Sequence, residues 1–248
     1  MKSLSFLLIL IFSISLSEAQ SIGSILKSVT KKDSARIKTT GTQQVNPQNF
    51  QTGDIAKGLK EALNQGTEKS VELLSKPDGF FGNAAIKILM PPEAQKIENS
   101  LRKLGLNKQV DDAILSMNRA AEDASKTAAP IFIKAIQQMS IEDAMGILRG
   151  NEDAATKYLQ SKTIDELTKN YRPSIETSLS KVGATKNWNS IVTQYNRFSF
   201  NKINPDLAAY VTEKTLNGIF LQIATEEKNI RKNPLARSSD LLKKVFGK

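Results

Sequence analysis

The sequence contains no cysteine and no histidine, and these two absences exclude several kinds of site. Without cysteine the chain can form no disulfide, and no lipid can be attached to an N-terminal cysteine. A Ser-His-Asp or Cys-His nucleophilic site is excluded, and so is a zinc site built on histidine or cysteine. Histidine is also the residue that most often moves protons near neutral pH. Catalysis by carboxylates, lysine or tyrosine remains possible. The sequence lacks the residues that most hydrolase mechanisms require.

Long apolar runs are also scarce, and the one at the start of the chain predicts export. Lys2 is followed by an apolar run over residues 4–16 and then by the small residues Ser17 and Ala19. A basic start, about a dozen apolar residues and small residues before the cut are typical of a secretory signal peptide. An uncleaved membrane anchor, the alternative, needs about 20 apolar residues. We therefore predict a signal peptide over residues 1–19, with the periplasm as destination and the extracellular space as the alternative.

Positive charge is in excess only near the two ends of the chain. The net charge is +10, of which residues 21–45 carry +4 and residues 228–248 carry +6, so residues 46–227 are neutral overall. Basic ends of this kind favour contact with an anionic lipid or glycan surface. Nucleic acid is a poor partner for an exported protein. The alternative is that the basic ends only aid solubility.

After the predicted cleavage site the chain divides into two parts. Residues 20–53 combine a short amphipathic segment with a polar stretch rich in Thr, Gln, Asn and Ser, which favours a flexible linker. From Asp54 onward apolar residues recur at helical spacing, and no segment shows the sustained alternation of a strand. We predict a single all-α domain of about eight to ten helices over residues 54–247. No segment after the signal peptide is predicted to span a membrane.

Several helix boundaries are predicted by local signals. Pro92 begins a helix that Gly105 ends. Residues 140–143 (Ser-Ile-Glu-Asp) form a capping box, and residues 163–166 (Thr-Ile-Asp-Glu) form a second one. Residues 204–206 (Asn-Pro-Asp) are a strong helix start. A final helix is expected after a serine cap at residue 238 or 239.

The most unusual loop of the sequence places two aromatic residues beside two glycines. One interpretation is a ligand-binding or membrane-touching loop, since apolar side chains stand on irregular backbone. The other is that the two aromatics fill the core while the glycines allow a tight path, and this is the commoner arrangement. The candidate loop consists of Lys76, Pro77, Asp78, Gly79, Phe80, Phe81, Gly82 and Asn83.

A candidate polar cluster lies in a predicted helix at Asn118, Arg119 and Glu122. Arg119 and Glu122 are spaced to pair along one face, and pairing at the surface is the default expectation. Glu226 and Glu227 are not predicted to form a catalytic dyad, because adjacent helical residues point about 100° apart.

Motifs distributed over the chain resemble the bacterial family catalogued as domain of unknown function 4197. The resemblance implies an exported helical protein and supplies no activity, cofactor or catalytic residue. Where the family tends to have an Asn-Pro pair and a Pro-rich stretch, this chain has Asn83-Ala84 and Ile88-Leu89-Met90. The matching motifs are Gly58-Leu-Lys-Glu-Ala-Leu63, Lys76-Pro-Asp-Gly-Phe80, Gly82-Asn83, Asn118-Arg-Ala-Ala-Glu122, Ile141-Glu-Asp-Ala144, Gly150, Tyr210-Val-Thr212, Glu226-Glu-Lys-Asn-Ile-Arg231, Asn233-Pro234 and Asp240-Leu-Leu-Lys-Lys-Val-Phe-Gly247.

The sequence favours a non-enzymatic binding or interaction module of the cell envelope that needs no cofactor. Its partner would be an envelope protein or an anionic lipid or glycan surface. One alternative is a carrier of a lipid or small apolar ligand, with Phe80 and Phe81 at its mouth, which requires an apolar cavity of a few hundred Å³. Another is a carboxylate-dependent enzyme using Glu122, which requires converging carboxylates and a perturbed pKa.

Overall fold

The regular secondary structure in the described part of the computed structural model is helical. The structure describes residues 52–181, 183–198, 200, 202–237, 243 and 245–246. The predicted signal peptide, most of the predicted linker and the predicted cap at residues 238 and 239 lie outside the described residues. Within the described part there are eight α-helices, two short 3-10 helices and no strand, which confirms the all-α prediction.

The helices follow one another with short connections, apart from the segment between the first two. They are α1 (Thr52–Leu74), η1 (Pro92–Ala94), α2 (Gln95–Lys103), α3 (Asn107–Ser125), α4 (Ala128–Gln137), α5 (Ile141–Arg149), α6 (Ala154–Lys181), α7 (Ala184–Phe198), α8 (Leu207–Lys232) and η2 (Pro234–Ala236).

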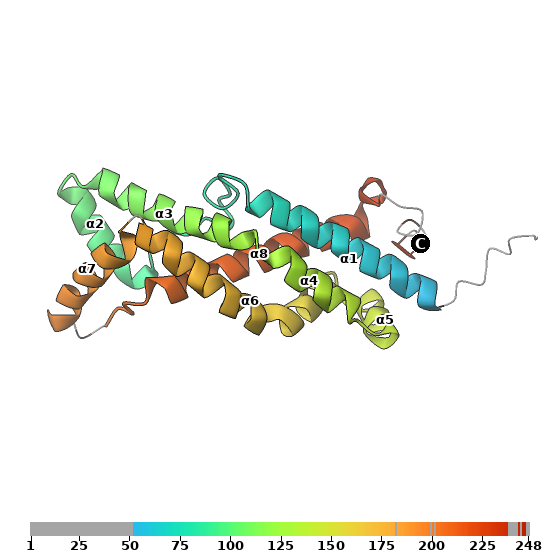
Figure 1. The fold of residues 1–248 in the computed structure, drawn as a ribbon. Helices are drawn as coiled ribbons and strands as arrows, with labels where there is room; N and C mark the ends of the chain where they lie inside the picture. Colours follow the sequence, from blue (N-terminus) through green and yellow to red (C-terminus); the bar gives the residue numbers. More distant parts are fainter. Residues whose placement is uncertain are drawn as a thin grey trace, which may run out of the picture. The chain divides into compact units, whose positions relative to one another are not determined.

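The long helices pack along one another and share a single main core (Figure 1). Helix α8 contacts α1, α3 and α6, while α4 contacts α1 and α6. Helices α2 and α7 lie at the end where α3 begins, and α5 lies at the opposite end (Figure 1). Large side chains fill the interior, among them Phe132, whose ring meets Phe220 edge-on at 5.9 Å. Burial of such apolar side chains is the main source of stability in a chain without disulfides.

Most of the predicted helix boundaries are confirmed, because each depends on a local contact. Ser140 and Asp143 form a reciprocal capping box, with both hydrogen bonds at 3.0 Å. The Asp206 carboxylate accepts from the Ala209 amide at the start of α8. Gly105 follows α2 with a φ of 79°, a conformation that glycine adopts without strain.

The second predicted capping box is wrong. Thr163 lies inside α6, is buried, and donates its hydroxyl to the Leu159 carbonyl one turn earlier. Leu159, Leu167 and Tyr171 continue the buried stripe past this point, so packing against the neighbouring helices keeps the chain helical. A four-residue cap signature cannot interrupt a helix whose apolar face is buried on both sides of it.

No helix in the described part of the chain is long and apolar enough to cross a lipid bilayer.

Candidate functional site

The candidate loop of residues 76–83 is anchored in the core through Phe80. The Phe80 side chain is 0 % exposed, and its ring lies against Gly218 of α8. A Cβ at position 218 would come within 2.6 Å of the Phe80 ring, so this site accepts only glycine without rearrangement. A Cβ on Gly79 would lie 2.6 Å from the Leu73 and Leu74 carbonyl oxygens at the end of α1. The core-filling interpretation is therefore confirmed for Phe80.

Glu122 of α3 holds the loop in place. One carboxylate oxygen accepts from the amides of Phe80 and Phe81, at 3.1 and 3.3 Å. The other accepts from Arg119 at 2.6 Å, and Arg119 also binds the Asp78 carboxylate at 2.8 Å. Glu122 is only 3 % exposed, so the expectation of a surface pair is wrong for this residue. The face of α3 that would have been solvent-exposed is covered by the loop.

Asn118 fixes the chain that follows the loop. Its side-chain amide accepts from the Ile88 amide at 2.9 Å and donates to the Ile88 carbonyl at 2.8 Å, as a neighbouring strand would. The same NH₂ group donates to the Ile114 carbonyl. The structure thus brings the predicted polar cluster and the predicted loop together as a clamp. An interaction role for residues 76–83 stays a prediction.

Phe81 differs from Phe80 in being only half-buried. The Lys87 ammonium lies 3.8 Å from the centre of its ring, and the Arg119 guanidinium carbon lies 5.9 Å away. Cations over an aromatic face are attracted by the ring quadrupole. Neither Phe81 nor Phe80 lines the apolar cavity described below. The carrier alternative places these two residues at the mouth of its cavity, whereas this cavity does not include them.

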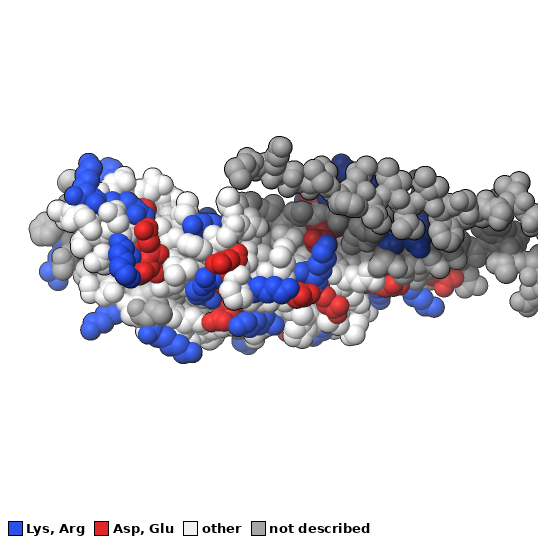
Figure 2. All heavy atoms as spheres, turned by 90° about the horizontal axis from the view of Figure 1, so that it is seen from above, with Lys and Arg blue, Asp and Glu red and all other residues white. Residues whose placement is uncertain are grey.

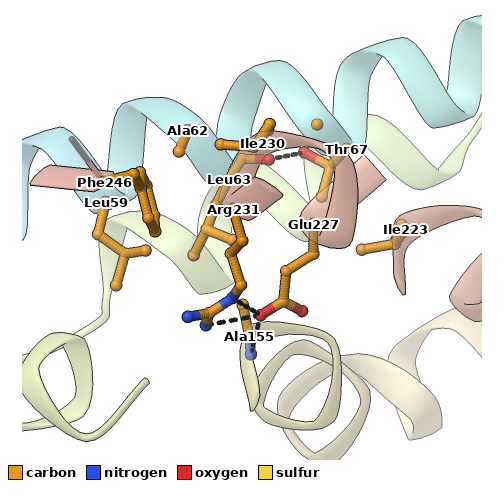
Figure 3. A pocket seen from close by; sticks show the side chains of 11 residues that line it. Leu59, Ala62, Leu63, Thr67, Ala155, Ile223, Glu227, Ile230, Arg231 and Phe246 are labelled. Carbon is orange, nitrogen blue, oxygen red and sulfur yellow. Dashed lines mark hydrogen bonds and ion pairs between the residues drawn. The ribbon is translucent and has the colours of Figure 1, made fainter. Parts of the chain in front are cut away.

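A second clamp is built around Glu227 of α8 (Figure 3), and nothing in the sequence indicated that this residue would bind the start of α6. Its carboxylate accepts from the Ala155 and Thr156 amides at the start of α6, at 3.0 and 2.9 Å. Arg231 binds it from one turn later at 2.8 Å and also donates to the Ile147 carbonyl of α5. Glu226 points elsewhere, to Lys69 of α1 at 2.7 Å. The two adjacent carboxylates diverge, as their spacing predicted.

The space beside this second clamp is nearly filled. Phe246, Leu59, Ala62 and Leu63 crowd around it (Figure 3), and the remaining cavity volume is about 20 Å³. Such a volume has room for about one water molecule and not for an organic ligand.

A much larger cavity of about 520 Å³ lies where α3, α7 and the start of α8 meet, and we call it the α3–α7 cavity. This volume falls within the range of about 300–1,000 Å³ that is typical of small-molecule sites. Most of its wall is aliphatic or aromatic, with a few hydroxyl and amide groups. The lining residues are Met90, Leu101, Leu106, Gln109, Val110, Asp112, Ala113, Ser116, Met117, Ala184, Asn187, Trp188, Ser190 and Leu207.

The α3–α7 cavity has no basic lining residue, and its one acidic lining residue is neutralised. Asp112 is bound by Lys108 one turn earlier, at 2.6 Å. An anionic or cationic ligand would therefore meet no unpaired opposite charge on the wall. The chemistry of the wall matches an uncharged molecule that buries mainly apolar surface.

Trp188 is the largest side chain in the wall of the α3–α7 cavity. It is 5 % exposed, and its indole N–H is shielded from solvent without a hydrogen-bond partner among the described residues. An unpaired buried donor costs about 1–3 kcal/mol. Trp188 is also the only tryptophan of the chain, so its fluorescence reports on this cavity alone. No motif in the sequence distinguishes it, because one aromatic on a helix is typical of core packing.

A polar cleft of about 300 Å³ between α4, α5 and α6 is lined by Asp143, Glu166 and Tyr158, so its chemistry bears on the enzyme alternative. The Ser140 amide and hydroxyl lower the pKa of Asp143, which forms the capping box of α5 with Ser140. Burial raises the pKa of Tyr158, whose hydroxyl lies 3.5 Å from Asp143. These directions favour a structural carboxylate and a neutral phenol, not a proton-transfer pair at neutral pH. Among the described residues no three Asp or Glu side chains are grouped to hold a metal ion.

Comparison with known proteins places the chain in a family. The family model described as "Protein of unknown function (DUF4197)" matches residues 49–247. The chain belongs to this family. The match includes every helix described above, together with both clamps and the α3–α7 cavity. No curated protein and no solved structure matched the chain.

Proposed function

We propose that this member of the DUF4197 family is an exported protein that binds a small, uncharged and mainly apolar molecule in the α3–α7 cavity. The observation that carries the proposal is the cavity itself, whose volume of about 520 Å³ and largely apolar wall meet the requirement for a carrier. The signal-peptide pattern of residues 1–19 supports export.

The geometry favours this binding role over the enzyme alternative. Glu122, the carboxylate suggested for catalysis, uses both oxygens to hold the 76–83 loop and Arg119. Glu227 is used in the same way at the start of α6. A carboxylate that accepts several hydrogen bonds inside the fold serves packing. The α3–α7 cavity, by contrast, has a mainly apolar wall and a volume large enough for a small molecule.

The proposal is tested with a neutral apolar dye, prodan, whose emission rises and shifts to the blue in apolar surroundings. We expect the protein to bind prodan with energy transfer from Trp188, since this residue lines the cavity. Ser116→Phe places a ring in the cavity and should weaken prodan binding by about tenfold or more.

A matched control is Ser161→Phe on the exposed surface of α6. Both serines donate their hydroxyl to a backbone carbonyl of their own helix, but only Ser116 lines the cavity. Ser161→Phe should therefore bind prodan as the unmodified protein does, provided that both variants keep their helical circular dichroism. Equal prodan binding by the two variants, or no binding by the unmodified protein, would refute the proposed site.

A further inference from the structure

Helix α7, which forms one wall of the α3–α7 cavity, is amphipathic. Trp188 and Val192 are buried on its inner face. Its outer face carries Lys186, Ser190, Thr193 and Arg197, all exposed, and Ser190 also lies at the rim of the α3–α7 cavity. Their spacing of four, three and four residues keeps them on one side of an α-helix. Lys186 and Arg197 thus point the same way from the two ends of one exposed stripe.

The sequence around α7 carries more basic than acidic residues. Residues 177–205 contain Lys181, Lys186, Arg197 and Lys202 and no acidic residue. The acids on either side, Glu176 and Asp206, are both bound by Arg172 of α6, at 2.8 and 2.7 Å. Among the described ion pairs none involves any of the four bases. The neutrality of residues 46–227 as a whole therefore hides a local excess of +4.

Two apolar side chains project from the same end of the helical body. Phe200 follows α7 and is fully exposed, and Leu104 in the α2–α3 turn is 75 % exposed. Both elements lie at the same end of the helical body as α2 and α7 (Figure 1). In the view from above, Lys and Arg side chains are spread over the whole visible face, this end included (Figure 2). We call Lys181, Lys186, Arg197, Phe200 and Lys202 the α7 surface.

We propose that the α7 surface binds an anionic phospholipid bilayer. Each lysine or arginine near an anionic leaflet is worth about 1 kcal/mol, and an aromatic ring beside them enters the headgroup region. The exposed Phe200 favours a bilayer over a soluble polyanion, which offers no apolar region to receive it. This inference does not rest on the cavity ligand proposed above, although the two sites share α7.

The test measures flotation of the full chain with vesicles of phosphatidylcholine containing phosphatidylglycerol at about 3:1, and with pure phosphatidylcholine. The double variant Lys186→Gln/Arg197→Gln removes two charges from the α7 surface and should weaken binding to the mixed vesicles by about 30-fold. The matched control is Lys162→Gln/Lys169→Gln, which removes the same charge from exposed positions on α6. It should retain most of the binding.

Phe200→Ser is the second arm of the test, because it leaves every charge in place. We expect it to weaken binding to the mixed vesicles by about tenfold. The proposal is wrong if the two double variants bind equally, since the basic segments outside α7 would then account for the binding. It is also wrong if Phe200→Ser binds like the unmodified protein, because the contact would then be that of a general polyanion site. Binding to pure phosphatidylcholine as strong as to mixed vesicles would contradict it as well.

Discussion

Phe80→Ala is expected to lower the free energy of unfolding by about 3–5 kcal/mol, the range for removal of a buried aromatic ring. The Phe80 ring has no exposed surface and lies against Gly218, which has no side chain to move into the space left behind. The loss is measured as the shift of the urea unfolding midpoint at unchanged slope.

Phe81→Ala is the matched control for this experiment. The Phe81 ring is half-buried, and its main polar neighbours are Lys87 and Arg119. Its removal should cost about 1 kcal/mol. Equal losses at the two positions would contradict the assignment of Phe80 as the residue that anchors the loop in the core.

Glu227→Gln is expected to cost about 3–5 kcal/mol, because it leaves the Arg231 guanidinium buried beside a neutral amide. The two side chains are 5 % and 14 % exposed, and the carboxylate also accepts both amides at the start of α6. The variant should therefore unfold at lower urea concentration and lose amide protection at residues 155 and 156.

The adjacent Glu226→Gln provides the comparison, with the same chemical change one residue away. Its partner Lys69 is mostly exposed and can be rehydrated when the pair is lost. We expect a cost of about 1 kcal/mol or less. A Glu226→Gln variant as unstable as Glu227→Gln would mean that the two carboxylates do not have separate roles in holding the helices together.

Local signals in the sequence predicted the helix boundaries where a side chain contacts the backbone within a few residues. The Ser140–Asp143 box and the Asp206 cap are examples, since every atom involved lies within one turn. The same reasoning failed at Thr163, where the buried stripe of α6 outweighs a local cap signature. Tertiary burial decides such cases, and periodicity over the whole helix is the better guide.

The clamps could be predicted only in part, because their contacts join distant segments. The sequence marked both the 76–83 loop and the Asn118–Glu122 cluster, but not that Glu122 would bind the loop amides some 40 residues away. No signal near residue 155 indicates that Glu227 caps α6. The polar sites that the sequence marked thus proved to hold the fold together.

The α3–α7 cavity had no signal in the sequence. Its wall comes from five separate parts of the chain, and its volume depends on how far α7 lies from α3. Leu101, Val110 and Trp188 each look like an ordinary residue of an amphipathic helix. Only the three-dimensional placement of α7 shows that these side chains line one cavity.

The most direct test of the binding account is native mass spectrometry of the protein purified from the cells that make it, beside the Ser116→Phe variant purified in the same way. We predict that the unmodified protein retains a neutral, organic-extractable molecule at up to one equivalent, and that Ser116→Phe lacks it. The absence of any such molecule from the unmodified protein, or the same molecule in equal amount on both proteins, would contradict a ligand site in the α3–α7 cavity.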